Sequence, residues 1–263
     1  SMLITSAQNG TPVHKNFWRN LENLSKKEIA KRLVIPFRYK NPTSVFTDMK
    51  HEFWDDALKG HLCESDFHLC DNLSILGDLK IQPTATRPLS GLEQVSGDKS
   101  AIVAHSKLEL KAVATPSNRF PKLLISTGCC TIENYTNSKA GYKGKKRHSL
   151  SAILVKVKGK KFFTRQIVAD DDGNFIDMKS QYHNGKVSKA PRAHVLSTGD
   201  LHAVNSDKQA LQATFFSDDS MVNYFRPKYI TLDDSLDFES GSHHGKKDPV
   251  LQHQLLMAGR SCV

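Results

Sequence analysis

Two short runs in the last third of the sequence place aspartate and histidine at the ends of apolar segments. The run 199–202 (Gly-Asp-Leu-His) follows the apolar stretch 193–196, and the run 233–237 (Asp-Asp-Ser-Leu-Asp) follows the strand-like stretch 229–232. Carboxylate oxygens and imidazole nitrogens at neighbouring strand ends can hold two divalent metal ions. Such ions clamp a phosphoryl group and activate water. The pattern therefore predicts a two-metal phosphoesterase site.

The order of these motifs resembles that of the calcineurin-like metallophosphoesterases. That family carries Asp-x-His, then Gly-Asp-x-x-Asp, then Gly-Asn-His followed by an acid, a further His, and Gly-His-x-His. Asp200 and His202 match the first motif, and the run 234–237 matches the second, with Asp233 in the position of its Gly. The run 241–244 (Gly-Ser-His-His) is a degenerate form of the third motif, with Ser in the position of Asn.

The resemblance implies a role for each matching residue. Asp200 and His202 would ligate the first metal, and Asp234 would bridge both ions. His243 or His244 would either ligate the second ion or protonate the leaving alkoxide. We assign His243 to catalysis and His244 to the metal. The implied cofactors are two divalent metal ions, with manganese as the expected ion.

The opening segment 5–12 (Thr-Ser-Ala-Gln-Asn-Gly-Thr-Pro), with the later motif order, is similar to phage-encoded members of this superfamily. The similarity implies a nuclease that hydrolyses DNA phosphodiesters in the cytoplasm of the phage host.

The chain departs from the family pattern after the third motif, since it contains no Gly-His-x-His. Three interpretations stay open. The chain is a fragment and the last histidine motifs lie downstream of Val263. Alternatively, earlier histidines such as His105 or His148 supply the missing ligands, or the site is degenerate and inactive. We favour the first.

Composition indicates a soluble protein with an anionic partner. The formal net charge is +10 and the mean hydropathy is −0.44. A strongly basic chain favours anionic partners, of which DNA is the obvious one, although many basic proteins bind no nucleic acid. We expect no membrane segment and no export signal, and therefore a cytoplasmic protein. The five cysteines are an odd number, which favours free thiols in a reducing compartment.

The densest basic run covers residues 143–148 and contains Lys143, Lys145, Lys146 and Arg147. Lysine offers phosphate a point charge and arginine a forked donor, so these four side chains are candidate nucleic-acid contacts. Gly144 and the strand-like segment that follows predict that the run forms a loop. A solvated hairpin tip explains the same run equally well.

The hydropathy pattern predicts an α/β fold of mixed sheets with flanking helices. A strand over 3–8, a helix over 16–32 and a strand over 33–37 form an N-terminal βαβ unit, so a parallel sheet begins here. Further strands are expected over 100–105, 108–114, 123–127 and 149–157, and they contribute to a phosphoesterase-like β-sandwich. We expect an N-terminal α/β region over 1–95 and a β-rich region over 96–263, which together can form one domain.

Other segments are less specific. A helix is predicted over 46–62 from its apolar face. The repeated His-Leu-Cys at 61–63 and 68–70 supplies four possible zinc ligands, but ordinary buried thiols explain it better. The run 170–174 (Asp-Asp-Asp-Gly-Asn) predicts a hairpin turn with a charged tip, and 175–189 is expected to be polar surface.

The favoured function is a divalent-metal-dependent nuclease. An alternative is a catalytically silent nucleic-acid-binding or oligomer-forming phage protein that keeps the fold without the full ligand set. A third is an enzyme that acts on a small phosphoester or nucleotide in the crevice of the N-terminal βαβ unit.

Overall fold

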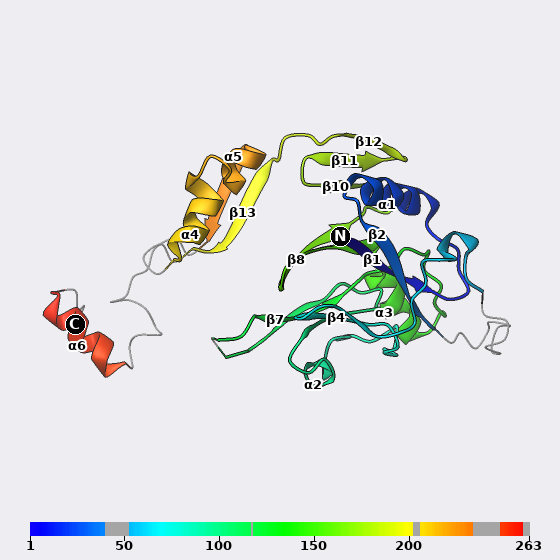
Figure 1. Ribbon diagram of the computed structural model, residues 1–263, viewed down its shortest axis with the longest axis horizontal. Coiled ribbons are helices and arrows are strands. Elements are labelled where there is room, and N and C mark those ends of the chain that lie inside the picture. The colour runs from blue at the N-terminus through cyan, green and yellow to red at the C-terminus, as the bar shows by residue number, and fades with distance from the viewer. Residues whose placement is uncertain (40–52, 117, 202–205, 234–247, 260–263) are drawn as a thin grey trace. The chain divides into compact units, whose positions relative to one another are not determined.

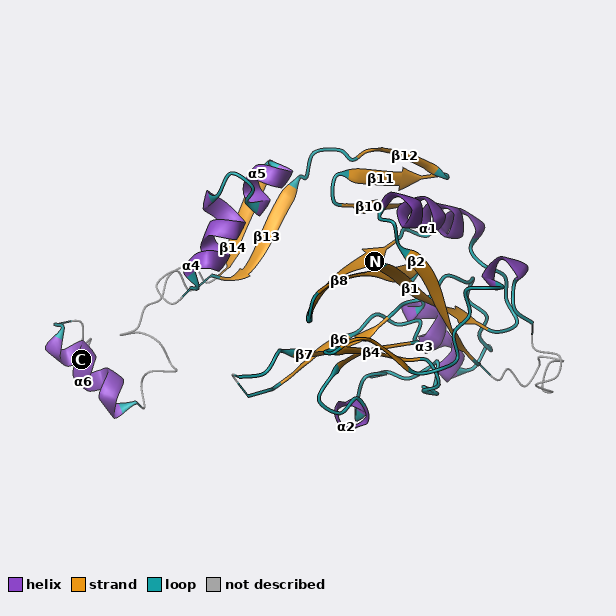
Figure 2. Ribbon diagram, in the orientation of Figure 1, coloured by secondary structure: helices purple, strands orange, loops and turns teal. Residues whose placement is uncertain are grey.

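The computed structural model describes all residues except 40–52, 117, 202–205, 234–247 and 260–263 (Figure 1). The chain divides into two compact units, Ser1–Ala190 and Pro191–Val263. The secondary structure is mixed α/β, as predicted, with several sheets and flanking helices (Figure 2). Among the described residues, no helix is both long and apolar enough to cross a membrane.

Unit 1 contains a four-stranded sheet of order β2-β1-β8-β9 and a five-stranded sheet of order β3-β4-β5-β7-β6, both mixed. A three-stranded antiparallel sheet, β10-β11-β12, follows them. The elements of unit 1 are β1 (Met2–Gln8), α1 (Lys15–Lys27), β2 (Lys31–Phe37), η2 (Asp56–Leu58), β3 (Phe67–Cys70), β4 (Leu73–Leu76), α2 (Leu92–Val95), β5 (Ser100–Val103), β6 (Leu110–Val113), β7 (Lys122–Ser126), α3 (Lys139–Arg147), β8 (Ser151–Lys158), β9 (Lys161–Val168), β10 (Phe175–Asp177), β11 (Ser180–His183) and β12 (Lys186–Lys189).

The predicted N-terminal βαβ unit is confirmed, because β1 and β2 pair in parallel on either side of α1. The helix is shorter than predicted and ends at Lys27. Ile29 takes a left-handed backbone conformation with φ of 47°, which few β-branched residues adopt. This turn stops the helix and brings Lys31 into register with Met2, so the chain enters β2 before Arg32.

The two large sheets form a sandwich with apolar side chains between them. Ile4 and Ile35 from the first sheet and Ile75 and Ile102 from the second belong to one buried cluster. A second cluster joins α1 to the other face of the four-stranded sheet, with Phe17 fully buried. Figure 1 shows α1 on the side of this sheet opposite the five-stranded sheet. Strands buried on both faces explain the continuous apolar runs in the sequence.

The strands predicted over 100–105, 108–114 and 123–127 are confirmed as β5, β6 and β7. They share one sheet with β3 and β4, since β4 pairs with β5 in parallel. The boundary that we predicted near residue 95 therefore lies inside unit 1, beside the short helix α2.

The predicted loop at residues 143–148 is wrong, because residues 143–147 lie in helix α3 and His148 is the residue that follows it. The Ser138 side chain caps the helix by accepting a hydrogen bond from the Gly141 amide at 3.0 Å. Both glycines of α3 are buried where the helix contacts its neighbours. A Cβ on Gly141 would lie 2.0 Å from the Thr136 carbonyl oxygen, and one on Gly144 would lie 2.9 Å from the Tyr135 ring. Close packing, and not a turn, accounts for these glycines.

Replacing Gly141 with Ala is therefore expected to destabilise unit 1 by about 1–3 kcal/mol, the usual cost of overpacking. The added methyl group meets the backbone oxygen of Thr136, which cannot rotate away. Urea denaturation followed by circular dichroism measures the change. Gly199→Ala is the matched control, since the Cβ position of Gly199 has no atom within 4 Å. Equal stability of Gly141→Ala and the wild type would contradict the packing of α3.

The prediction of polar surface over 175–189 is wrong in part, because the segment folds as β10, β11 and β12 against α1. Phe175 and Tyr182 are buried and stack with ring centroids 4.7 Å apart. The preceding turn is held by the Asp170 carboxylate, which accepts a hydrogen bond from the backbone N–H of Asn174 at 2.7 Å. The Asn20 side-chain amide donates to the Gly173 carbonyl at 2.8 Å, so one side of this turn packs on α1. Asp171 and Asp172 remain exposed at its tip, as predicted.

The helix predicted over 46–62 is not present in its described part. Residues 46–52 lie outside the described residues, and the remainder forms only the 3₁₀ turn η2. The Asp55 carboxylate accepts from the amides of Ala57 and Val13 at 2.9 and 3.0 Å. The chain then joins the edge of the four-stranded sheet, where Leu62 forms a bridge with Val34.

Unit 2 is built on two parallel strands joined by helices. Its elements are β13 (Val195–Asp200), α4 (Lys208–Leu211), the π-helical turn η3 (Gln212–Phe216), α5 (Met221–Phe225), β14 (Tyr229–Asp233) and α6 (Pro249–Met257). Strands β13 and β14 form a two-stranded parallel sheet, so β13, the helical crossover and β14 make a second βαβ unit.

Candidate functional site

The two runs that carry the predicted metal ligands end neighbouring strands of unit 2. Leu196 pairs with Ile230, and Asp200 pairs with Asp233 after a register shift. The Leu201 amide donates to the Asp233 carbonyl at 3.0 Å, and the Thr198 hydroxyl donates to the Thr231 carbonyl at 3.3 Å. Because the strands are parallel, both runs meet at the same edge of the sheet. The backbone therefore brings two aspartate-bearing strand ends side by side.

The crossover between the strands is short and capped by polar side chains. The Asp207 carboxylate accepts from the Ala210 amide at 2.9 Å at the start of α4. The Ser220 hydroxyl accepts from the Asn223 amide at 3.3 Å at the start of α5. Carboxyl ends of parallel strands, followed by loops, are where α/β folds place their ligands. This local geometry explains why Asp200 lies at a position suited to chemistry.

Most of the predicted ligands lie outside the described part of the chain. Asp200 is the last residue of β13, whereas His202, Asp234, His243 and His244 fall in the ranges that the structure leaves out. The described residues contain no group of three or more His, Cys, Asp or Glu side chains that could hold a metal ion. What the described backbone supplies is the alignment of Asp200 with Asp233.

The predicted nucleic-acid contacts all lie on helix α3 of unit 1. Lys143, Lys145 and Lys146 are exposed, whereas Arg147 is half-buried. Lys145 forms an ion pair with Glu133 at 3.4 Å, and the Lys146 ammonium lies 5.6 Å from the centre of the Tyr142 ring. The helix therefore presents three cations to solvent within little more than one turn.

A pocket of about 660 Å³ lies beside α3 and is lined by both positively and negatively charged side chains. Lys145 and Lys146 contribute the positive side, and Glu133, Asp170 and Asp171 contribute the negative side. Lys145 and Lys146 therefore border this pocket as well as standing exposed on α3.

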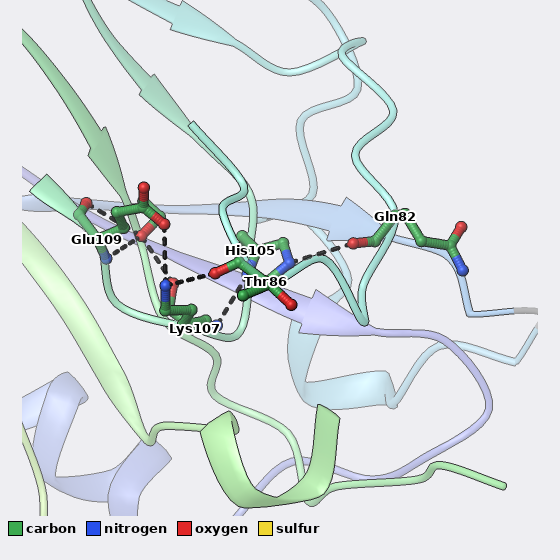
Figure 3. A network of polar contacts seen from close by, with 6 residues as sticks. Gln82, Thr86, His105, Lys107 and Glu109 are labelled. Carbon is green, nitrogen blue, oxygen red and sulfur yellow. Dashed lines mark hydrogen bonds and ion pairs between the residues drawn. The ribbon is translucent and has the colours of Figure 1, made fainter. Parts of the chain in front are cut away.

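His105 follows the end of β5 and is held by two hydrogen bonds from the protein (Figure 3). Its Nδ1 accepts from the Lys107 amide at 2.9 Å, so its Nε2 carries the proton and donates to the Gln82 carbonyl at 3.2 Å. Burial lowers the pKa of this imidazole and outweighs the two backbone hydrogen bonds. Both ring nitrogens are used, which leaves His105 without a lone pair for a metal ion.

Both ring nitrogens of His148 also have protein partners, one a backbone carbonyl and the other a tyrosine hydroxyl. Its Nε2 donates to the Thr131 carbonyl at 2.8 Å, and its Nδ1 contacts the Tyr135 hydroxyl at 3.2 Å. The Tyr135 hydroxyl also contacts the Ser106 hydroxyl at 2.8 Å. Burial lowers the pKa of His148, but the negative charge of a Cys129 thiolate, hydrogen bonds to Cys129 and to the Thr131 carbonyl, and the charge of Glu133 outweigh it, so the net pKa is raised. Among the described residues, neither His105 nor His148 belongs to a group of three or more possible metal ligands.

The network of Ser106, Tyr135 and His148 was not predicted from the sequence. Its members are separated by 29 and 13 residues, and no motif spacing connects them. Burial raises the pKa of Tyr135, so its hydroxyl stays protonated and available as a donor. The network joins the end of β5 to the segments on both sides of α3. We interpret it as the polar support of that helix.

In the repeated His-Leu-Cys motif, the two histidines contact other side chains and the two cysteines are free thiols. The His68 Nδ1 contacts the Ser74 hydroxyl at 2.9 Å, and the His61 ring lies 5.7 Å from the Trp18 ring. Cys63 and Cys70 are partly buried free thiols. Within the described ranges these side chains belong to no group of three or more possible metal ligands.

The chain is similar to a phage protein and, at a low level, to a solved structure. No family model matches the chain. Protein A1 of Escherichia phage T5 is 29% identical over 272 residues, which cover 99% of this chain and 49% of that protein. The chain thus spans about half the length of this curated relative. A crystal structure of a Vps29 double mutant from Entamoeba histolytica superposes with a TM-score of 0.37 at 16% identity, covering 65% of this chain and 95% of that one.

Proposed function

We propose that this chain is part of a divalent-metal-dependent phosphodiesterase of the calcineurin-like superfamily, and that its metal centre forms at the carboxyl ends of β13 and β14. The observation that carries the proposal is the parallel pairing that aligns Asp200 with Asp233. His202 lies two positions after Asp200, and Asp234 directly follows Asp233. Similarity to a phage protein supports a phage origin for the activity.

The chemistry of the donor set fits hard or borderline divalent ions. Asp200 and Asp234 offer carboxylate oxygens, and His202 and His244 offer imidazole nitrogens, a combination suited to manganese. Bound ions would polarise the phosphoryl oxygens and lower the pKa of a bound water. His243 is our candidate for protonating the leaving alkoxide. We propose DNA as the substrate, because the chain carries a net charge of +10.

The test is cleavage of supercoiled plasmid DNA by the purified chain. With Mn²⁺ we expect conversion to nicked and linear forms, and with EDTA we expect none. The activity should favour plasmid over a small chromogenic phosphodiester, since the basic surface adds affinity only for the polymer. Absence of Mn²⁺-dependent cleavage would contradict the proposal. A preference for the small ester would instead support an enzyme of small phosphoesters.

A second candidate function is nucleic-acid binding by unit 1 without catalysis. The specific observation in its favour is the exposed row of Lys143, Lys145 and Lys146 on α3. These side chains extend from a capped helix that is supported by buried contacts, so their spacing is fixed. Such a surface contacts phosphates and carries no base specificity.

Replacing Lys143, Lys145 and Lys146 with Gln is expected to weaken DNA binding uniformly across sequences. Each lost phosphate contact should also reduce the slope of log affinity against log salt by roughly 0.9. Fluorescence anisotropy with a labelled duplex at several salt concentrations measures both effects.

The matched control makes the same charge change on another part of unit 1, at Lys179, Lys186 and Lys189 near β11 and β12. General electrostatic attraction alone would make the two triple variants equally weak. A reduced salt slope in the α3 variant only would assign the phosphate contacts to α3.

A further inference from the structure

Unit 1 contains a pocket of about 410 Å³ that the proposed metal centre does not use. It is lined by the carboxyl end of β2, through Phe37 and Arg38, and by the carboxyl end of β4, through Gly77 and Asp78. Strands from both sheets of the sandwich therefore end at this pocket. In α/β folds the crevice beyond the carboxyl ends of parallel strands is the usual ligand site.

One part of the pocket is apolar and suited to a flat ring. Pro36, Phe37, Leu79, Ile81 and Pro83 line it. Pro36, Phe37 and Pro83 are buried, and Leu79 and Ile81 are half-buried. Proline and branched aliphatic side chains have few accessible rotamers, so this wall is stiff and keeps its shape without a ligand. A pocket of this size accommodates a ligand of the dimensions of a nucleotide.

The other part of the pocket is lined by side chains of both positive and negative charge. The Arg38 guanidinium pairs with the Glu64 carboxylate at 3.0 Å and lies 5.7 Å from the centre of the Trp54 ring. Exposed Asp78 and Lys80 complete this polar side. The Glu64 side chain is 55% exposed, so it can turn into solvent when an anion approaches Arg38. A guanidinium fork fixed against an aromatic ring matches phosphate oxygens.

The segment that forms the pocket wall is anchored to the sheet behind it (Figure 3). His105 Nε2 donates to the carbonyl of Gln82, and the Lys107 ammonium donates to the Thr86 carbonyl at 2.7 Å. Lys107 in turn pairs with Glu109 at 3.1 Å. These contacts hold the loop after β4 in place, so little ordering is required when a ligand binds.

We propose that this pocket binds a mononucleotide, either free or as the terminal nucleotide of a DNA strand. The base lies against the apolar wall, and its amino group donates to the carboxylate of Asp78. The phosphate binds Arg38, with Lys80 as a second cation. All the residues of this site belong to unit 1, and its binding requires no metal ion.

The experiment is a titration of the whole chain with the four deoxynucleoside 5′-monophosphates in EDTA, by calorimetry and by tryptophan fluorescence. Trp54 reports on Arg38, because the two side chains are in contact. We expect saturable binding that Arg38→Gln weakens at least tenfold. Arg119→Gln is the matched control, since Arg119 pairs with Asp98 at 2.9 Å in the turn before β7 and does not line the pocket. This control should bind as the wild type does.

A second variant guards against loss of folding in Arg38→Gln. Leu79→Trp fills the apolar part of the pocket from a half-buried position and is expected to abolish binding with unchanged circular dichroism. Inorganic phosphate and unphosphorylated nucleosides should each bind at least tenfold more weakly than the nucleotide.

Two further arms distinguish the free ligand from a strand terminus. A short single strand with a 5′-phosphate should bind as well as the mononucleotide if the pocket accepts termini, and more weakly if it takes the free nucleotide only. Either result supports nucleotide binding. No saturation at millimolar nucleotide, equal binding by Arg38→Gln, or equal binding of phosphate alone would overturn the proposal. None of these outcomes bears on Mn²⁺-dependent cleavage, because EDTA is present.

Discussion

Replacing Asp200 with Asn is expected to lower Mn²⁺-dependent cleavage of plasmid DNA by roughly a hundredfold or more, an effect typical of the loss of a catalytic-metal contact. Asn keeps the size of the side chain but removes the negative charge that a divalent ion requires. Asp200 ends β13 opposite Asp233, so the substitution leaves the strand pairing unchanged and alters only the strand end. Initial rates at saturating and limiting Mn²⁺ measure the loss.

Metal binding gives this prediction a readout that is independent of turnover. Electron paramagnetic resonance of free Mn²⁺ should show weaker binding by Asp200→Asn than by the wild type. If Asp200 were only a turn residue, both metal affinity and cleavage would remain near wild-type values while stability changed. Such a result would place the metal centre elsewhere.

The matched control is Asp218→Asn, which makes the same change of charge within unit 2. Asp218 is exposed in the turn between η3 and α5, after the crossover has left the carboxyl end of β13. We expect this variant to cleave DNA at the wild-type rate. A comparable loss in both variants would indicate a general electrostatic effect on DNA affinity and would contradict a specific role for Asp200.

The strands of this protein were predictable because they are buried on both faces. Ile4 in β1 and Ile35 in β2 lie in continuous apolar runs, which parallel strands between two layers require. The segment 175–189 was not predictable in this way, since its strands bury only one face and Phe175 and Tyr182 are its principal buried aromatic side chains. Its pairing depends on α1, which lies far away in the sequence.

Helix α3 shows how tertiary contacts can reverse a local preference. Gly141 and Gly144 indicate a loop on propensity alone, yet both are required where Thr136 and Tyr135 approach the helix. The candidate metal site shows the opposite case. Two apolar runs with polar ends indicated the two strands, whereas their parallel pairing, which aligns Asp200 with Asp233, is visible only in the structure.

Replacing Arg165 with Ala is expected to lower the free energy of unfolding of unit 1 by about 3 kcal/mol, the cost of leaving a buried carboxylate without its partner. Arg165 on β9 donates two hydrogen bonds to Asp177, from Nε at 2.9 Å and from Nη2 at 2.7 Å. The Asp177 side chain is only 6% exposed, so water cannot replace the guanidinium. The contact also ties β10 to the four-stranded sheet.

The same guanidinium contacts Glu28 just after α1 at 3.1 Å, and Lys156 on β8 completes the group at 2.6 Å from Glu28. This group of charged side chains therefore connects β8, β9 and β10 with the end of α1. We expect the melting temperature to fall by roughly 6–12 °C in Arg165→Ala. Arg165→Lys should recover only part of the loss, because an ammonium cannot make two parallel hydrogen bonds to one carboxylate. Arg119→Ala, which removes an exposed pair, should change stability by less than about 1 kcal/mol.

The pH dependence of stability distinguishes a role of Arg165 through charge from a role through packing. Burial raises the pKa of Glu28, but the hydrogen bond from Lys156 and the charges of Arg165 and Lys156 outweigh it, so the net pKa lies below the ordinary value of 4.5. A carboxyl whose pKa is lower in the folded state binds fewer protons there. Its contribution to stability is therefore present above pH 4.5 and is lost as the pH falls through the folded value. The stability difference between the wild type and Arg165→Ala should be constant near neutral pH and shrink below pH 4.5. Urea denaturation at pH 7 and at lower values measures it, and a difference that stayed constant in acid would show that Arg165 acts through packing and not through charge.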